Sequence, residues 1–258
     1  MDLKGKKIVI TGASCGIGYE LAKCLLAEGA IVVGVSRNMQ KNDTEHPNFY
    51  KLDMDVSSPE GVDKVFDYAI GKMGCVDIFV ANAGYAFYQK LGTPDWERYH
   101  KAFDLNVFSA LYGAQKMKQL YPESPYSVLI TASAMGFISL PGYALYSATK
   151  AALRAFADAY RYELGQDQKI QVVYPIATAT DFFAAAGDIP ISWPVQSASH
   201  VAKKMVKGLK RGKAHIHTSF VFVFFKLLTA LCPPLVRLYN IRNYNAFKKW
   251  QEKQDNQA

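Results

Sequence analysis

A glycine-rich turn joins the first apolar run of the chain to its first helical segment. Lys7–Thr11 is short and β-branched, and the three glycines of Gly12-Ala13-Ser14-Cys15-Gly16-Ile17-Gly18 follow it directly. Glycine lets a backbone turn sharply and approach a bound group, while the next helix offers unpaired N–H groups to a phosphate. The turn therefore predicts a βαβ unit that binds a dinucleotide through Gly12, Ser14, Cys15, Gly16, Ile17 and Gly18. A glycine-rich turn without a ligand is the alternative.

Short β-branched runs alternate with longer helical segments from Lys6 to about Ser219. This alternation is typical of an α/β fold, a Rossmann-like doubly wound parallel sheet in one domain. We expect strands at Lys7–Thr11, Ala30–Ser36, Asn48–Asp53, Asp77–Ala81, Ser127–Ser133, Ile170–Tyr174 and Ala214–Thr218. We expect helices at Gly16–Glu28, Pro59–Lys72, Pro94–Leu120, Tyr143–Leu164 and Ala198–Arg211, and a short or irregular helix within Asn38–Pro47.

The spacing of the glycine turn, Thr-Gly-x-x-x-Gly-x-Gly, resembles that of the short-chain dehydrogenase/reductase family. Further matches follow in the family's order, and the resemblance spans roughly residues 5–218. It implies that Asp55 and Val56 hold the adenine ring of a nicotinamide dinucleotide. It also implies that Asn82, Ala83 and Gly84, at the end of the fourth strand, support the cofactor and the sheet.

The end of the second strand bears on which dinucleotide fits, because the adenosine ribose lies there. An NAD enzyme places an acidic side chain near the ribose 2′-hydroxyl. This chain has Ser36 and Arg37 instead, and a guanidinium pairs with a 2′-phosphate that a carboxylate would repel. We therefore expect NADP(H), with an NAD-dependent alcohol dehydrogenase of the same fold as the alternative.

The family's Tyr-x-x-x-Lys motif occurs five times in this chain, at Tyr19/Lys23, Tyr68/Lys72, Tyr112/Lys116, Tyr146/Lys150 and Tyr244/Lys248. Only Tyr146/Lys150 follows a strand that ends in a serine, and Tyr146 lies 13 residues after Ser133 as in the family. Residues four apart share a helix face, so both side chains can point into one cleft. The other four pairs are interpreted as surface lysines beside packed tyrosines.

Carbonyl reduction explains these residue types. The reaction needs a hydride at carbon and a proton at oxygen, and Tyr146 is the predicted proton donor. A free tyrosine has a pKa of about 10, which a nearby Lys150 ammonium lowers. Ser133 is expected to donate a hydrogen bond to the substrate oxygen. By resemblance, Lys150 also bonds the nicotinamide ribose, and Asn106 holds a water that relays protons.

The segment after the sixth strand departs from the family. The family reads Pro-Gly with a threonine four residues later, whereas this chain has Pro175-Ile176 followed by Thr178 and Thr180. The resemblance implies that Pro175, Thr178 and Thr180 touch the nicotinamide. If that backbone needs positive φ, Ile176 fits it poorly and the loop is rearranged. A dinucleotide-sensing binding protein without catalysis is the reading that Ile176 alone supports.

A mobile lid over the substrate is implied for Asp181–Pro194. The apolar content of that segment, with Tyr85, Phe87, Met135 and Phe137 near the strand ends, favours a hydrophobic carbonyl substrate. These four side chains fit a core role equally well.

Residues 219–258 are expected to form a C-terminal extension beyond a catalytic domain of residues 1–218. Residues 200–258 hold 12 basic and 2 acidic side chains, and the apolar run Phe220–Cys232 has 13 residues against the about 20 needed to cross a bilayer. The extension fits contact with a membrane surface, a cover over the substrate pocket or a dimer contact. It resembles lipid-handling family members such as 3-ketodihydrosphingosine reductase.

The remaining composition limits the partners. Four cysteines without a CxxC pair suggest no zinc site and no disulfide framework. We expect a cytoplasmic protein, since no signal peptide precedes the first strand, with peripheral membrane contact as an option. A homodimer or homotetramer is expected, and no nucleic-acid partner.

Overall fold

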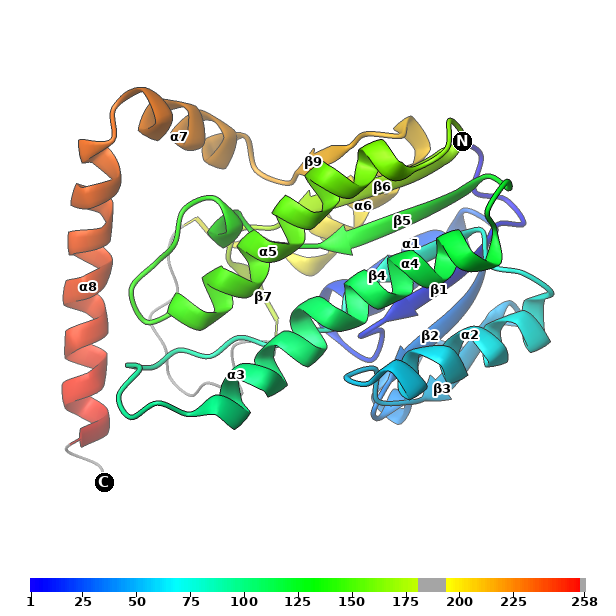
Figure 1. Ribbon diagram of the computed structural model, residues 1–258, viewed down its shortest axis with the longest axis horizontal. Helices are drawn as coiled ribbons and strands as arrows, with labels where there is room; N and C mark the ends of the chain where they lie inside the picture. Colours follow the sequence, from blue (N-terminus) through cyan, green and yellow to red (C-terminus); the bar gives the residue numbers. More distant parts are fainter. Residues whose placement is uncertain (181–193, 256–258) are drawn as a thin grey trace.

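Seven parallel strands form the central sheet in the order β3-β2-β1-β4-β5-β6-β9 (Figure 1). The computed structural model describes residues 1–180 and 194–255. The strands are β1 (Lys7–Thr11), β2 (Ile31–Ser36), β3 (Phe49–Asp53), β4 (Ile78–Ala81), β5 (Tyr126–Thr131), β6 (Gln168–Tyr174) and β9 (His215–His217). Two short strands, β7 (Thr178–Ala179) and β8 (Gln196–Ser197), pair apart from this sheet. The strand order reverses beside β1, which is where doubly wound sheets bind ligands.

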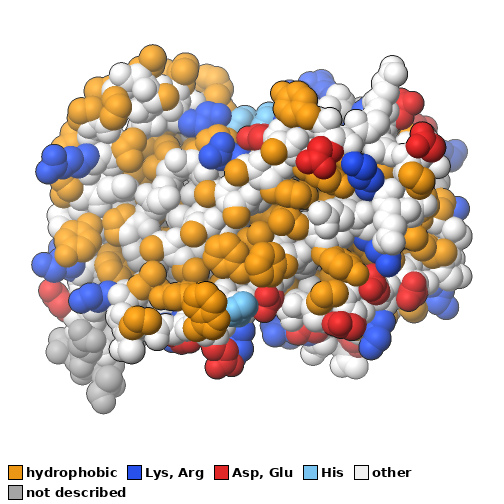
Figure 2. Space-filling view, viewed as in Figure 1, with side chains coloured by type: hydrophobic (Ala, Val, Ile, Leu, Met, Phe, Trp, Pro, Cys, Tyr) orange, Lys and Arg blue, Asp and Glu red, His pale blue; other side chains and the backbone are white. Residues whose placement is uncertain are grey.

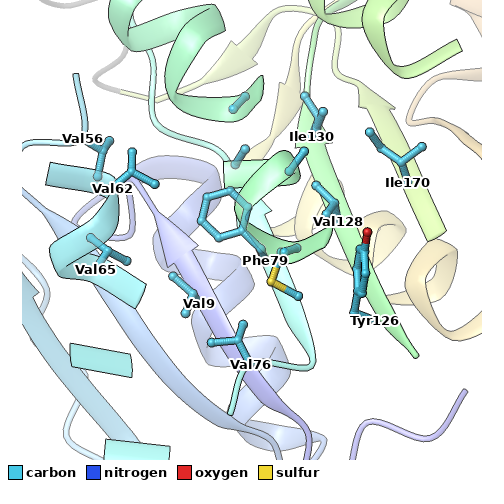
Figure 3. Close-up of a cluster of buried hydrophobic side chains, with 14 of the residues drawn as sticks. Val9, Val56, Val62, Val65, Val76, Phe79, Tyr126, Val128, Ile130 and Ile170 are labelled. Carbon is cyan, nitrogen blue, oxygen red and sulfur yellow. The ribbon is translucent and has the colours of Figure 1, made fainter. Parts of the chain in front are cut away.

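Helices cover both faces of the sheet (Figure 1). One face packs against α2 (Pro59–Met73), α4 (Ser109–Leu120) and α5 (Ala144–Tyr160), and the other against α1 (Gly16–Ala27) and α6 (Ala198–Arg211). Alternate residues of β1 enter the two cores: Val9 lies with Phe79 in one (Figure 3), and Ile8 and Ile10 lie in the other. Burial on both sides explains why the strands are continuously apolar. The predicted α/β fold is confirmed.

One helix that was predicted as continuous is interrupted in the structure. Pro94–Leu120 consists of α3 (Trp96–Phe103), a π-helical turn at Asp104–Phe108, and α4. Helix α3 starts at Trp96, later than predicted, because the Asp95 carboxylate caps it and accepts a hydrogen bond from Arg98 N at 3.0 Å. Other bounds shift by a few residues: α5 ends at Tyr160, and a 3-10 turn at Arg161–Glu163 follows. The polar stretch 38–47 holds one 3-10 turn at Met39–Lys41, as expected.

The C-terminal residues form two helices at one end of the molecule (Figure 1). These are α7 (Phe220–Leu231) and α8 (Pro234–Asp255). Phe247 and Trp250 of α8 dock against Tyr88, with ring centroids 5.2 and 4.8 Å apart. Across residues 1–180 and 194–255, no helix has the length and apolar character that crossing a membrane requires. The division of the chain at residue 218 stays a prediction.

Candidate active site

Two cavities meet beyond the carboxyl ends of the central strands. The first has a volume of about 370 Å³ and lies over the glycine turn. Most of the predicted site residues line it: Gly12, Ser14, Cys15, Gly16, Ile17, Ser36, Arg37, Asp55, Val56, Asn82, Ala83, Gly84, Ser133, Tyr146, Lys150, Pro175, Thr178 and Thr180. Gly18 and Asn106 do not line it. Sequence motifs that lie far apart in the chain thus converge on one cavity.

The glycine turn is shaped by close backbone packing. Gly12 has a φ of +70°, which favours glycine. A Cβ on Gly18 would lie 2.1 Å from the Gly12 carbonyl oxygen, so Gly18 supports the turn from beneath. The Asn82 amide nitrogen donates to the carbonyls of Thr11 and Gly12 at 3.1 and 3.2 Å.

The N-terminus of α1 opens onto this cavity. Cys15 occupies the N-cap position without a side-chain hydrogen bond, and the first turn of the helix holds no acidic residue. Free N–H groups without a neighbouring negative charge are what a pyrophosphate needs. The residues present therefore fit a dinucleotide.

The cavity ends at a basic corner. Ser36, Arg37, Asn38 and Lys41 line it there. Asp53, at the end of β3, is engaged by the backbone, because its carboxylate accepts from Met39 N at 2.6 Å. Sequence reasoning missed Asn38 and Lys41, although Lys41 lies only four residues beyond Arg37. The corner offers two cations to a bound anion.

Ser133, Tyr146 and Lys150 are brought together from β5 and α5. The Ser133 hydroxyl lies close enough to the Tyr146 phenol to lower the pKa of that phenol. Lys150 Nζ lies 5.6 Å from the centroid of the Tyr146 ring and donates to the Thr131 carbonyl at 2.8 Å. The Ser133 hydroxyl also accepts from Met135 N at 3.1 Å, which fixes its position.

Burial shifts the acidity of both titratable groups. It raises the pKa of Tyr146, and the hydrogen bond from Ser133 lowers that pKa by a smaller amount. Burial lowers the pKa of Lys150 to about 8. Desolvation penalises the charged form of each group, so the two shifts have opposite signs. Charge on either group is therefore sensitive to what fills the cavity.

The other four Tyr-x-x-x-Lys pairs lie outside both cavities. Tyr112 and Lys116 both bind Asp63, at 3.0 and 2.8 Å. In the remaining pairs the lysine lies over the ring of its own tyrosine, as Lys23 does at 4.9 Å from the Tyr19 centroid. Location, and not the motif itself, distinguishes Tyr146/Lys150.

Asn106 lies in the π-helical turn and is buried. Its amide donates to the Tyr85 carbonyl at 2.9 Å and to Thr149 Oγ1 at 3.2 Å, and its oxygen accepts from Tyr85 N at 2.9 Å. These bonds fix the backbone after β4 beside the cavity. Both amide hydrogens are engaged in this way, so the side chain links this backbone to α5 through Thr149. Water binding at Asn106 stays a prediction.

The second cavity, of about 530 Å³, is mostly apolar. It shares Ser133, Met135, Ile176 and Ala177 with the first, so the two cavities adjoin at these four residues. Side chains of α7 and α8 form one wall: Val221, Phe222, Phe225, Tyr239, Arg242, Asn243 and Ala246. The C-terminal extension therefore covers this pocket, which was one of the three roles considered for it.

Four apolar side chains were considered for the substrate pocket, and their positions differ. Met135 lines both cavities, and Tyr85 lines the first. Phe87 lines neither and packs edge-on against Tyr85 at 4.5 Å. Phe137 also lines neither, and it contacts Tyr174 at 4.8 Å. Phe137 and Phe87 thus have packing roles.

The segment after β6 is free of the strain considered for Ile176. Every described residue with positive φ is a glycine, so Ile176 does not need that conformation. The Pro175 carbonyl accepts from Ala134 N at 2.9 Å, and Thr180 lies against the glycine turn, its methyl 3.2 Å from where a Cβ on Gly16 would be. The conformation of Ile176 therefore gives no support to a dinucleotide-sensing protein without catalysis. The lid predicted at 181–194 lies outside the described residues except for Pro194.

Known proteins resemble this chain along most of its length. The short chain dehydrogenase family model matches residues 6–188. The 11-beta-hydroxysteroid dehydrogenase 1A of Arabidopsis thaliana is 29% identical over 261 residues, covering 91% of this chain and 74% of the relative. The uncharacterized oxidoreductase YbbO of Escherichia coli strain K12 is 31% identical over 204 residues, covering 77% of this chain and 75% of the relative.

Solved structures share the fold. A short chain dehydrogenase/reductase from Burkholderia phymatum in complex with NAD has a TM-score of 0.82 at 19% identity, covering 91% of this chain and 96% of that one. A short chain dehydrogenase from Burkholderia cenocepacia J2315 in complex with NADP has a TM-score of 0.80 at 20% identity. The match covers 93% of this chain and 98% of that one. At such identities the likeness concerns the fold alone.

Proposed function

The chain belongs to the short-chain dehydrogenase family, and from this premise we propose that it is an NADP(H)-dependent oxidoreductase that interconverts a carbonyl and an alcohol on a hydrophobic substrate. One observation carries the proposal. Ser133 lies where the two cavities join, and the buried Tyr146 and Lys150 line the first cavity beside it. A carbonyl oxygen that enters from the apolar side would reach this hydroxyl and phenol.

The proposed chemistry assigns a separate task to each side chain. A bound nicotinamide supplies or accepts the hydride. Ser133 donates a hydrogen bond to the substrate oxygen, and Tyr146 gives that oxygen a proton during reduction and removes one during oxidation. Lys150, when charged, favours the phenolate and so lowers the cost of moving the proton.

Preference for NADP(H) is supported by the basic corner. Arg37 and Lys41 line the first cavity there, and Asp53, at the end of β3, accepts a backbone hydrogen bond. Two cations stabilise a 2′-phosphate, and the guanidinium can bond it through several donors. An NAD-dependent dehydrogenase is the alternative, and cofactor titration separates the two.

A hydrophobic substrate is supported by the walls of the second cavity and by one group of relatives. The relatives include proteins named as 11-beta-hydroxysteroid dehydrogenases. Steroids are largely apolar, as is the substrate proposed for this chain. A cavity of about 530 Å³ lies in the range that holds drug-sized ligands.

We also propose that the outer face of α7 touches an anionic membrane surface while the protein stays otherwise cytoplasmic. Phe220, Phe224, Leu227 and Leu231 expose 83, 60, 59 and 78% of their surface. Figure 2 shows apolar side chains gathered over α7 with basic side chains nearby. Exposed aromatic and aliphatic side chains with basic residues nearby favour contact with an anionic membrane surface. A homodimer or homotetramer remains a proposal, with this face or another as the contact.

The function is tested by NADPH oxidation across medium- and long-chain ketones, steroids and sugars. We expect turnover of apolar ketones, and Tyr146→Phe should lower kcat by about 10³-fold because the proton donor is lost. Tyr112→Phe, from a pair outside the cavities, is the matched control and should leave turnover unchanged. Wild-type turnover in Tyr146→Phe would contradict the proposed role of the phenol.

A further inference from the structure

One face of α8 forms a wall of the apolar cavity. Tyr239, Arg242, Asn243 and Ala246 line it, and their spacing of three and four residues is that of a single helix face. The next turns of the helix anchor this wall, because Phe247 and Trp250 pack against Tyr88. The side chains of α8 that face the cavity are therefore held at a fixed position.

Arg242 is the one charged residue among the described residues that line this cavity. Among the side chains of residues 1–180 and 194–254, no carboxylate lies within 4.0 Å of its guanidinium. The nearest acid along the helix is Glu252, ten residues further on, or about 15 Å at 1.5 Å per residue. Arg242 is an exposed residue that also lines the cavity, which puts it at the cavity rim.

We infer that Arg242 binds a carboxylate on the substrate, so that the enzyme prefers carbonyl compounds with an apolar body and an acidic end. The inference deepens the proposed function and rests on it. An arginine presents parallel N–H donors that match the two oxygens of a carboxylate. The apolar body would lie along the cavity toward Ser133, while the acidic end stays at the hydrated rim. An arginine that only contacts water is the competing interpretation.

A cation at the rim also selects against neutral substrates of the same shape. A neutral ester fills the apolar cavity equally well but gains nothing from the guanidinium. A site with an unpaired charge discriminates by the interaction that the wrong ligand fails to make. Acid and ester of equal chain length are therefore the informative pair.

Binding provides a test that does not need turnover. We would titrate the enzyme saturated with NADP⁺ with dodecanoate and with methyl dodecanoate by calorimetry. Dodecanoate should bind about tenfold more tightly than the ester. Arg242→Gln should remove this difference and Arg242→Lys should keep part of it, because lysine retains the charge but not the paired donors. Arg237→Gln, on another face of α8, should behave as wild type.

Turnover measurements distinguish the role of Arg242 from the proposed oxidoreductase function. The substrates are a 12-carbon oxo acid and its methyl ester. Arg242→Gln should raise KM for the acid about tenfold, and it should leave kcat for both compounds and KM for the ester unchanged. An equal acid preference in wild type and Arg242→Gln, in binding or in KM, overturns the inference. Absence of turnover for every carbonyl compound would instead contradict the proposed function, while the binding comparison would still decide the role of Arg242.

Discussion

Lys150 Nζ donates a hydrogen bond to the carbonyl oxygen of Thr131 at a distance of 2.8 Å. This bond ties helix α5, which carries Tyr146 and Lys150, to the end of β5, the strand that Ser133 follows. It fixes the ammonium near the Tyr146 ring before any ligand binds. The position of the amine is thus a property of the fold, whereas its charge depends on pH.

The pKa of Lys150, lowered to about 8 by burial, predicts a pH-dependent stability. Between pH 8 and 10.5 the unfolded state binds more protons at this site than the folded state, so stability rises with pH. From pH 7.5 to 9.5 the wild type should gain about 2 kcal/mol of unfolding free energy relative to Lys150→Met. Urea unfolding at both pH values measures this gain.

The matched control for that experiment is Lys116→Met. Lys116 lies in a half-buried pair outside both cavities, and its hydrogen bond with Asp63 raises its pKa, so it stays charged across this range. The difference in unfolding free energy between Lys116→Met and the wild type should not change with pH. A constant difference for Lys150→Met as well would show that the buried amine does not titrate near pH 8.

Arg37→Gln should weaken NADPH binding by about 10- to 100-fold, because a charge-assisted contact with the 2′-phosphate is lost. NADH lacks that phosphate, and its Kd should change little. Lys41→Gln should also weaken NADPH binding, but by less. Lys64 lines neither main cavity, so Lys64→Gln is the control and should leave NADPH binding unchanged. Fluorescence titration with both cofactors measures each Kd. Tighter binding of NADH than NADPH to the wild type would remove the NADP(H) assignment.

Gly18→Ala should lower the free energy of unfolding by about 2 kcal/mol and weaken NADPH binding. The added Cβ would lie 2.1 Å from the Gly12 carbonyl oxygen, so the turn must shift. Gly71→Ala is the control, because no atom lies within 4 Å of a Cβ there and alanine favours the helix by up to about 1 kcal/mol. Urea unfolding and NADPH titration compare the two. Equal stability of both variants would contradict the packing described for the turn.

Phe224→Glu should reduce binding to vesicles that contain anionic phospholipid by about tenfold or more, since an exposed apolar contact is replaced by a repelled charge. Tyr162→Glu is the control, as Tyr162 is 89% exposed on the 3-10 turn after α5. Co-sedimentation measures the bound fraction. Unchanged sedimentation with a shift from dimer to monomer would identify a second copy of the chain as the partner of this face.

Much of the cofactor cavity could be predicted from local sequence patterns. The glycine turn, Arg37 and Asn82 each follow a strand directly, and parallel strands end at one edge of the sheet. Tyr146 could be singled out only through its distance from Ser133. The comparisons confirm the family and the fold, while the roles of these residues stay predictions.

Features that depend on distant contacts could not be predicted. The π-helical turn at Asp104–Phe108 contains Asn106, whose partners Tyr85 and Thr149 lie on other elements. The wall formed by α8 depends on Phe247 and its partner Tyr88, far apart in the chain. A polar C-terminal sequence gives no local sign of such docking.

Helix α7 has two apolar sides with different surroundings: Phe222 and Phe225 face the cavity, while Phe220 and Phe224 face outward. A chain that stops at residue 218 would therefore lose one wall of the cavity together with the exposed apolar side of α7. Slow turnover by such a shortened protein would not show which of the two losses caused it. Single substitutions on the outward side leave the cavity wall in place, so they test the proposed membrane contact separately from the enclosure of the proposed substrate.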